Sequence, residues 1–275
     1  MSARFRTLVL TGATSGIGEA TALRLAGSAD RLILLGVESE ADAATTLHRI
    51  RRAGTAHVHY LAADFTRLAA VVDAARRVGE LARSIDLLIN DAGVPGAEQR
   101  ILTDDGFERT LQVNALAPAL FTRLLLPRLA IGARIVNVGS SAHRIEHFDF
   151  DDVDLDHDYS PVSAYARAKL ATVTWSSLLA EEEAGTGVEV IALCPGLNDT
   201  PLSAAMTGGI GGPPSHGAAR VLFAAAAAPS GSYLENDRVV APSAEVTDPA
   251  NRSRLTALLH DRLSRFADHP TGTRR

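Results

Sequence analysis

The sequence has little cysteine, little lysine and no long apolar run. Its single cysteine, Cys194, excludes an internal disulfide, and the N-terminal MSARFRTLVL lacks the longer apolar stretch and cleavage site of a secretory signal. The richest apolar run, VLFAAAAAP, ends at Pro229 and falls short of the roughly 20 residues that span a bilayer. These absences predict a cytoplasmic protein in a reducing compartment, without a membrane span.

The sequence has slightly fewer positively than negatively charged residues. The 275-residue chain has 27 Lys and Arg against 32 Asp and Glu, which gives a formal net charge of -5 and a sequence pI of about 6.0. It therefore lacks the basic field that attracts nucleic acid or an acidic membrane surface, and neither is expected as a partner. Its composition, 46% hydrophobic and 21% charged, is typical of an ordinary globular protein.

Short apolar runs alternate with longer amphipathic segments, a pattern typical of βαβ units and a parallel sheet. Strands are predicted at 7–10, 31–35, 57–62, 85–89, 133–138 and 188–193. Helices are predicted at 17–27, 41–53, 67–82, 105–130, 163–184 and 249–266. Although the length permits two small domains, the unbroken alternation predicts one doubly wound α/β domain (Rossmann fold) over 1–275, with a disordered polar tail at 268–275.

Two stretches interrupt this rhythm, and both are predicted to be loops at the carboxyl ends of the strands, where such a sheet binds its ligand. The first, 143–161, is acidic and contains histidines; the second, 197–217, is rich in glycine and proline. The histidines and aspartates are irregularly spaced and match no zinc or calcium ligand pattern, so no metal site is predicted. His143 is a candidate for substrate contact, whereas Cys194 is assigned no role beyond packing.

A glycine-rich segment, TGATSGIG, follows the first predicted strand and opens a helix. Its G-x-x-x-G-x-G spacing permits a tight turn in which main-chain amides and the positive helix end can hold a pyrophosphate. The alternative is an ordinary turn between a strand and a helix. The predicted cofactor contacts in this segment are Gly12, Thr14, Ser15, Gly16, Ile17 and Gly18.

The end of the second predicted strand bears on the choice of dinucleotide. Glu38 lies about 20 residues past the glycine-rich segment, where an acidic residue binds the adenosine ribose hydroxyls and an arginine would accept a 2′-phosphate. No Arg or Lys occurs between Gly36 and Glu40. The sequence favours NAD and leaves NADP open. The alternative is that Glu38 and Glu40 only solvate a loop.

Tyr165 and Lys169 are four residues apart on a predicted helix, so their side chains share one face. At about 4 Å and an effective dielectric near 20, a cation attracts a phenolate by roughly 4 kcal/mol. Lys169 is therefore predicted to lower the pKa of Tyr165 toward neutrality. Lys169 is the one lysine among 27 basic residues, although such a pair on a helix is common by chance.

Together, these features resemble the short-chain dehydrogenase/reductase superfamily, and in particular its retinol dehydrogenase-like and protochlorophyllide reductase-like branch. The resemblance runs from about Thr7 to Leu202. It rests on seven motifs in the family's order: TGATSGIG, Asp64 in LAADF, NDAG at 90–93, VNA around Asn114, RIVNVGSSAH, YARAK and PGLNDT.

The resemblance implies a role for each motif. Tyr165 would donate or accept the substrate proton and Ser140 would bind the reacting oxygen. Lys169 would bind the nicotinamide ribose, and Asn114 would position a water. Further cofactor contacts are implied at Asp64, Phe65, Asn90, Ala92, Gly93, Pro195, Gly196 and Thr200.

The chain departs from the family's pattern at several positions near the site. Asp91 stands where the family usually has a second asparagine. Pro118, four residues after Asn114, is predicted to bend the helix by deleting a backbone hydrogen bond. The family also implies a homodimer or homotetramer formed through the helices at 105–130 and 163–184.

The predicted function is an NAD(P)-dependent oxidoreductase that interconverts a carbonyl and an alcohol on a small to medium apolar molecule. One alternative keeps the cofactor but performs a non-redox step, either cyclisation or dehydration. Another is a nicotinamide-binding regulator without catalysis. The substrate and the direction of the reaction stay open.

Overall fold

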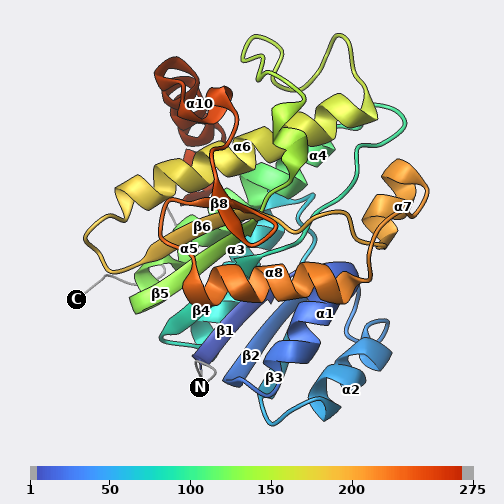
Figure 1. Ribbon diagram of the computed structural model, residues 1–275, viewed down its shortest axis with the longest axis vertical. Coiled ribbons are helices and arrows are strands. Elements are labelled where there is room, and N and C mark those ends of the chain that lie inside the picture. Colours follow the sequence, from blue (N-terminus) through green and yellow to red (C-terminus); the bar gives the residue numbers. More distant parts are fainter. Residues whose placement is uncertain (1–4, 268–275) are drawn as a thin grey trace.

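An eight-stranded sheet runs through the molecule with helices on both faces (Figure 1). The computed structural model describes residues 5–267, so the tail predicted at 268–275 lies outside the described residues. The strand order is β3-β2-β1-β4-β5-β6-β7-β8, and only β8 is antiparallel to its neighbour. The strands are β1 (Phe5–Thr11), β2 (Ala29–Gly36), β3 (His57–Ala62), β4 (Ile85–Asn90), β5 (Leu129–Val138), β6 (Glu189–Cys194), β7 (Tyr233–Glu235) and β8 (Arg238–Val240).

The six predicted strands are confirmed, because their apolar runs are buried against helices on both sides. Leu8, Val9 and Leu10 of β1 are fully buried, and so are Leu32 and Ile33 of β2. The chain order reverses between β1 and β4, which pair in parallel on the side of β1 away from β2. An open α/β sheet binds its ligand at this switch point, so the fold predicts where the site lies.

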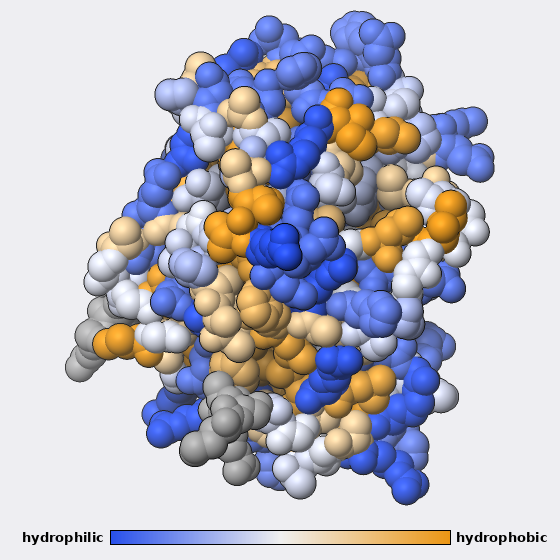
Figure 2. All heavy atoms as spheres, in the orientation of Figure 1, coloured by the Kyte–Doolittle hydropathy of each residue, from blue (hydrophilic) through white to orange (hydrophobic). Residues whose placement is uncertain are grey.

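One face of the sheet is covered by α1 (Gly16–Leu25), α2 (Ala44–Arg52) and α8 (Pro214–Ala227). Helix α8 packs against α1, β5 and β6. Its alanine-rich sequence also leaves apolar side chains at the surface, among them Phe223, and Figure 2 shows such side chains gathered over α8. No helix within residues 5–267 is both long enough and apolar enough to cross a membrane.

The prediction that 197–217 is wholly a loop was wrong. A short helix, α7 (Pro201–Thr207), lies within it, and α8 begins before it ends. Thr200 caps α7 by accepting the Ser203 N–H, Pro201 stands in the first turn, and the left-handed Gly208 ends the helix. The high content of glycine and proline is typical of a loop, but here proline marks the start of the helix and glycine marks its end.

The other face carries α3 (Leu68–Leu81), α5 (Ala117–Leu125) and α6 (Pro161–Glu182). The helix predicted at 105–130 is broken into α4 (Arg109–Leu111), a π-helical turn (Gln112–Leu116) and α5. Pro118 explains the break, because it has no N–H to donate to the carbonyl of Asn114. That carbonyl instead accepts the Thr172 hydroxyl at 2.9 Å.

The C-terminal helices α9 (Ala244–Thr247) and α10 (Pro249–Ala267) contact the acidic segment 143–161 through side-chain hydrogen bonds and ion pairs. Helix α10 packs on α6, α5 and α3 through side chains that include Leu255 and Leu263. Arg262 binds both carboxylate oxygens of Asp154 at 2.9 and 2.6 Å. Since α10 lies against α5 and α6, it covers part of the helices implicated in oligomer formation; the oligomer stays a prediction.

Arg262→Met is expected to lower the free energy of unfolding by about 2 kcal/mol, because it leaves the largely buried carboxylate of Asp154 without its cation. Urea unfolding measures the effect. Arg254→Met is a matched control on the same helix, since Arg254 also lies over a phenylalanine ring but pairs with the exposed Asp151. Equal losses in both variants would contradict the role given to the buried pair.

Candidate active site

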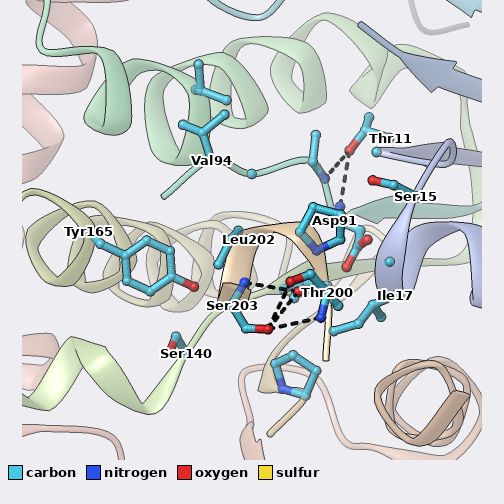
Figure 3. A pocket seen from close by; sticks show the side chains of 18 of the residues that line it. Thr11, Ser15, Ile17, Asp91, Val94, Ser140, Tyr165, Thr200, Leu202 and Ser203 are labelled. Carbon is cyan, nitrogen blue, oxygen red and sulfur yellow. Dashed lines mark hydrogen bonds between the residues drawn. The ribbon is translucent and has the colours of Figure 1, made fainter. Parts of the chain in front are cut away.

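A cavity of about 630 Å³ lies at the carboxyl ends of the strands, between the glycine-rich segment and α7. The predicted site residues in its wall are Gly12, Thr14, Ser15, Gly16, Ile17, Glu38, Asp64, Phe65, Ala92, Gly93, Ser140, Tyr165, Lys169, Pro195, Gly196 and Thr200. Gly18, Asn90 and Asn114 lie outside it. Side chains far apart in the sequence thus meet in one space (Figure 3).

The glycine-rich segment is packed closely against the loop after β4 and against itself, so a larger side chain at its glycines would clash. A Cβ on Gly12 would lie 2.8 Å from the main chain of Ala92, and one on Gly18 would lie 2.1 Å from the carbonyl oxygen of Gly12. Ser15 precedes α1 in an extended conformation and makes no side-chain cap. The first amides of α1 therefore lack a side-chain acceptor beside the cavity, an arrangement that fits a dinucleotide pyrophosphate.

Glu38 follows β2 and lines the cavity, and its contact with an adenosine ribose stays a prediction. Its carboxylate accepts the Thr14 hydroxyl at 2.7 Å, and its main-chain carbonyl accepts the Tyr60 hydroxyl at 2.7 Å. These two bonds attach Glu38 to the glycine-rich segment and to β3. Asp64 and Phe65 line the same end of the cavity.

Ser140, Tyr165 and Lys169 meet at the opposite end. Figure 3 shows the hydroxyls of Tyr165 and Ser140 facing the same space. Lys169 is buried, and its Nζ donates to the Val138 carbonyl at 2.8 Å while lying 5.6 Å from the centre of the Tyr165 ring. Helix α6 and the end of β5 thus supply all three side chains.

The predicted lowering of the Tyr165 pKa was wrong for this structure. Burial raises the pKa of Tyr165 to about 12, and the nearby Ser140 hydroxyl offsets only part of that effect. The ammonium of Lys169 is directed to the Val138 carbonyl and not to the phenol oxygen. Burial also lowers the pKa of Lys169 itself to about 8, so the cation has a desolvation cost of its own.

Asp91 is a further ionisable group in the cavity wall, and it was not among the predicted contacts. Figure 3 shows it beside the glycine-rich segment, and its Oδ2 lies 2.7 Å from the position of a Cβ on Gly18. Burial raises the pKa of Asp91 to about 7, while Lys169 acts in the opposite direction. The signal was present in the sequence, because Asp91 replaces the family's second asparagine.

Asn90 and Asn114 lie outside the cavity wall; Asn90 bonds to other side chains, and Asn114 bonds to the main chain of Val94. The amide of Asn90 donates to Thr122 at 2.9 Å and to Asn137 at 2.7 Å. Asn114 accepts the Val94 N–H at 2.8 Å and donates to the Val94 carbonyl at 3.0 Å. The cofactor contact of Asn90 and the water positioning by Asn114 stay predictions.

Several apolar side chains that no motif indicated line the same cavity as Tyr165. They are Val94, Ile145, Leu202 and Met206. They come from segments whose sequence has no regular period, so their convergence could not be predicted. Cys194 also lines the cavity, although no role was assigned to it.

His143 is fully buried and lies outside the cavity wall, so its predicted contact with substrate was wrong. It belongs to the short 3-10 turn Ser141–Arg144 that follows Ser140. Within residues 5–267, no group of three or more His, Cys, Asp or Glu side chains could hold a metal ion.

Comparison with known proteins agrees with this arrangement. A family model described as short chain dehydrogenase matches residues 6–209. Human retinol dehydrogenase 13 is 36% identical over 200 residues, which cover 72% of this chain and 60% of the relative. Mouse polyprenol dehydrogenase is 37% identical over 205 residues, which cover 72% of this chain and 61% of the relative. The chain therefore spans less than two thirds of the length of these two relatives.

Solved structures show the same fold. A crystal structure of a protein from Mycobacterium Paratuberculosis has a TM-score of 0.78 and 30% identity, covering 95% of this chain and 94% of that one. A short chain dehydrogenase from Burkholderia cenocepacia J2315, in complex with NADP, has a TM-score of 0.69 and 26% identity, covering 85% and 97%. The chain belongs to the short-chain dehydrogenase/reductase family, in its retinol dehydrogenase-like branch.

Proposed function

We propose that the protein is an NAD(P)-dependent oxidoreductase that interconverts a carbonyl and an alcohol on a small to medium apolar molecule. The observation that carries this proposal is the meeting of Ser140, Tyr165 and Lys169 in the same cavity as the glycine-rich segment. A cofactor-binding regulator would have no need of a serine and a tyrosine hydroxyl that face one space beside a buried lysine.

The chemistry follows from the groups around Tyr165. When bound, the nicotinamide supplies or accepts the hydride. The hydroxyls of Ser140 and Tyr165 would bind the reacting oxygen, and a phenol with a pKa near 12 retains its proton at neutral pH and can donate it during carbonyl reduction. Lys169 would bind the nicotinamide ribose hydroxyls through the proton donors that Val138 does not use.

The apolar wall supports the choice of an apolar substrate. Leu202 and Met206 on α7 and Ile145 after the 3-10 turn line the cavity, and they would exclude water from the reacting oxygen. Charged or highly polar carbonyl compounds would lose hydration there without a partner. We therefore expect apolar aldehydes and ketones to be the better substrates.

NAD is the proposed cofactor, because Glu38 stands where its carboxylate would meet the adenosine ribose. The Burkholderia structure is a complex with NADP, so NADP stays the alternative cofactor. The cytoplasmic location predicted from the sequence stays a prediction.

The test is turnover of a panel of aliphatic and aromatic aldehydes and ketones with NADH and with NADPH, followed by cofactor absorbance. Oxidation of the cofactor coupled to alcohol formation supports the proposal. Conversion of a compound with no net change in the cofactor would favour the non-redox alternative. Tight cofactor binding without any turnover would favour the regulator.

Asp91→Asn is expected to move the alkaline limb of the pH profile of kcat/KM to lower pH by at least about half a pH unit. The Asp91 carboxylate raises the pKa of Lys169, so removing its charge lowers that pKa below about 8. Activity that needs protonated Lys169 is then lost earlier as the pH rises. Profiles between pH 6 and 10 measure this, and an unchanged alkaline limb would contradict the coupling of Asp91 to Lys169.

A further inference from the structure

His143 is a buried histidine whose two ring nitrogens both face main-chain groups. Its Nδ1 lies 2.7 Å from the carbonyl oxygen of Ser140, and the N–H of Ser243 donates to its Nε2 at 3.0 Å. The ring is 0% exposed and packs edge-on against Tyr233, with ring centres 4.8 Å apart. It thus joins the residue before the 3-10 turn to a segment 100 residues further along the chain.

These contacts define the protonation of the ring. Because Nε2 accepts an N–H, the proton of the neutral ring must lie on Nδ1, which donates to the Ser140 carbonyl. Burial lowers the pKa of His143 and Arg144 acts in the same direction, while the Ser140 carbonyl and Glu235 oppose them. The ring therefore stays neutral and keeps a single tautomer.

The main chain of Ser140 depends on this tautomer. Ser140 caps the 3-10 turn, with its hydroxyl oxygen accepting the Ala142 N–H at 3.2 Å, so that the hydroxyl's direction follows its backbone. The carbonyl of Ser140 is held by the His143 ring at 2.7 Å and by the His143 main-chain N–H at a longer 3.2 Å. Arg144 ties the same turn to the Ala241 carbonyl at 2.6 Å.

We propose that His143 is a positioning residue, which fixes the main chain of Ser140 and thereby aims the Ser140 hydroxyl at the reacting oxygen beside Tyr165. The inference rests on the proposed function, because it assigns His143 a task in the same reaction. His143 touches neither substrate nor cofactor and acts only through Ser140.

Two substitutions separate the bonds of the ring. The amide of His143→Asn occupies about the place of Nδ1 and can still donate to Ser140, whereas the amide of His143→Gln reaches toward Nε2 and Ser243. We expect kcat to fall about tenfold in His143→Gln and less than about threefold in His143→Asn, with NADH affinity unchanged in both. Equal losses of kcat in the two variants would overturn the proposal in favour of a packing role.

The double variant with Ser140→Ala tests whether the effect passes through Ser140. If it does, adding His143→Gln to Ser140→Ala lowers kcat no further, because the two changes remove one interaction. A second loss of about tenfold in that background overturns the proposal. Thermal unfolding of each variant identifies any loss that comes from misfolding.

Failure of the proposed function can be distinguished from failure of this inference. If the wild-type protein turns over no compound of the panel, the proposed function fails, and crystal structures of the two variants test the positioning role directly. A Ser140 hydroxyl displaced in His143→Gln and retained in His143→Asn supports the role. A Ser140 hydroxyl that stays in place in both variants overturns it.

Discussion

Tyr165→Phe is expected to lower kcat by at least about 100-fold while leaving the dissociation constant of NADH nearly unchanged. The substitution keeps the aromatic ring against Lys169 but removes the phenolic hydroxyl and its proton. General acid or base catalysis by a positioned side chain contributes roughly 10²–10⁴ in rate, and this variant should lose most of that contribution. Steady-state kinetics and cofactor fluorescence titration measure the two quantities.

Tyr159→Phe is the matched control for this experiment. Tyr159 also loses a hydroxyl, but that hydroxyl donates to the Ala97 carbonyl at 2.9 Å and lies outside the cavity wall. We expect kcat to change less than about twofold in this control, as for a substitution away from the reacting atoms. If Tyr165→Phe retained wild-type turnover, Tyr165 could not be the proton donor.

Glu38→Arg is expected to change the ratio of kcat/KM for NADH to that for NADPH by about 100-fold, in favour of NADPH. A guanidinium at this position binds a 2′-phosphate bidentately, whereas the carboxylate repels it. The loss of the bond between Glu38 and Thr14 adds a smaller cost for both dinucleotides. Kinetics with each cofactor, at saturating carbonyl compound, give the ratio.

Glu40→Arg separates this specific effect from a general change in charge. Glu40 is two residues further along, is exposed and pairs with Arg51 at 3.1 Å. We expect it to alter the ratio less than about threefold, because exposed charges are screened by solvent and salt. An equal change in both variants would mean that Glu38 only solvates the loop.

The strands that could be predicted are the six that have six or more residues, which is long enough to show an apolar pattern. The run LILL at 32–35 predicts β2 because helices bury such a strand on both faces. The three-residue strands β7 and β8 were missed, since so short a segment shows no period. Their place is decided by pairing with β6, which is a tertiary contact that the sequence does not display.

The site was predictable where its residues are close together in the chain. The spacing of Tyr165 and Lys169 placed both on one face of α6, and the glycine spacing placed the loop before α1. The pKa values and hydrogen-bond partners of these groups were not predictable, because burial and residues distant in the chain determine them. Lys169 donates to Val138, 31 residues away, and the two bonds of His143 reach both Ser140 and Ser243.

The most direct test of the central claim is transfer of deuterium from NADH labelled at C4 of the nicotinamide. After turnover of an apolar aldehyde or ketone in ordinary water, the mass of the alcohol shows whether its carbinol carbon carries the label. We expect one deuterium per alcohol formed with NADH labelled on one face, and none with NADH labelled on the other. An alcohol free of deuterium from both labelled forms would contradict hydride transfer at this site.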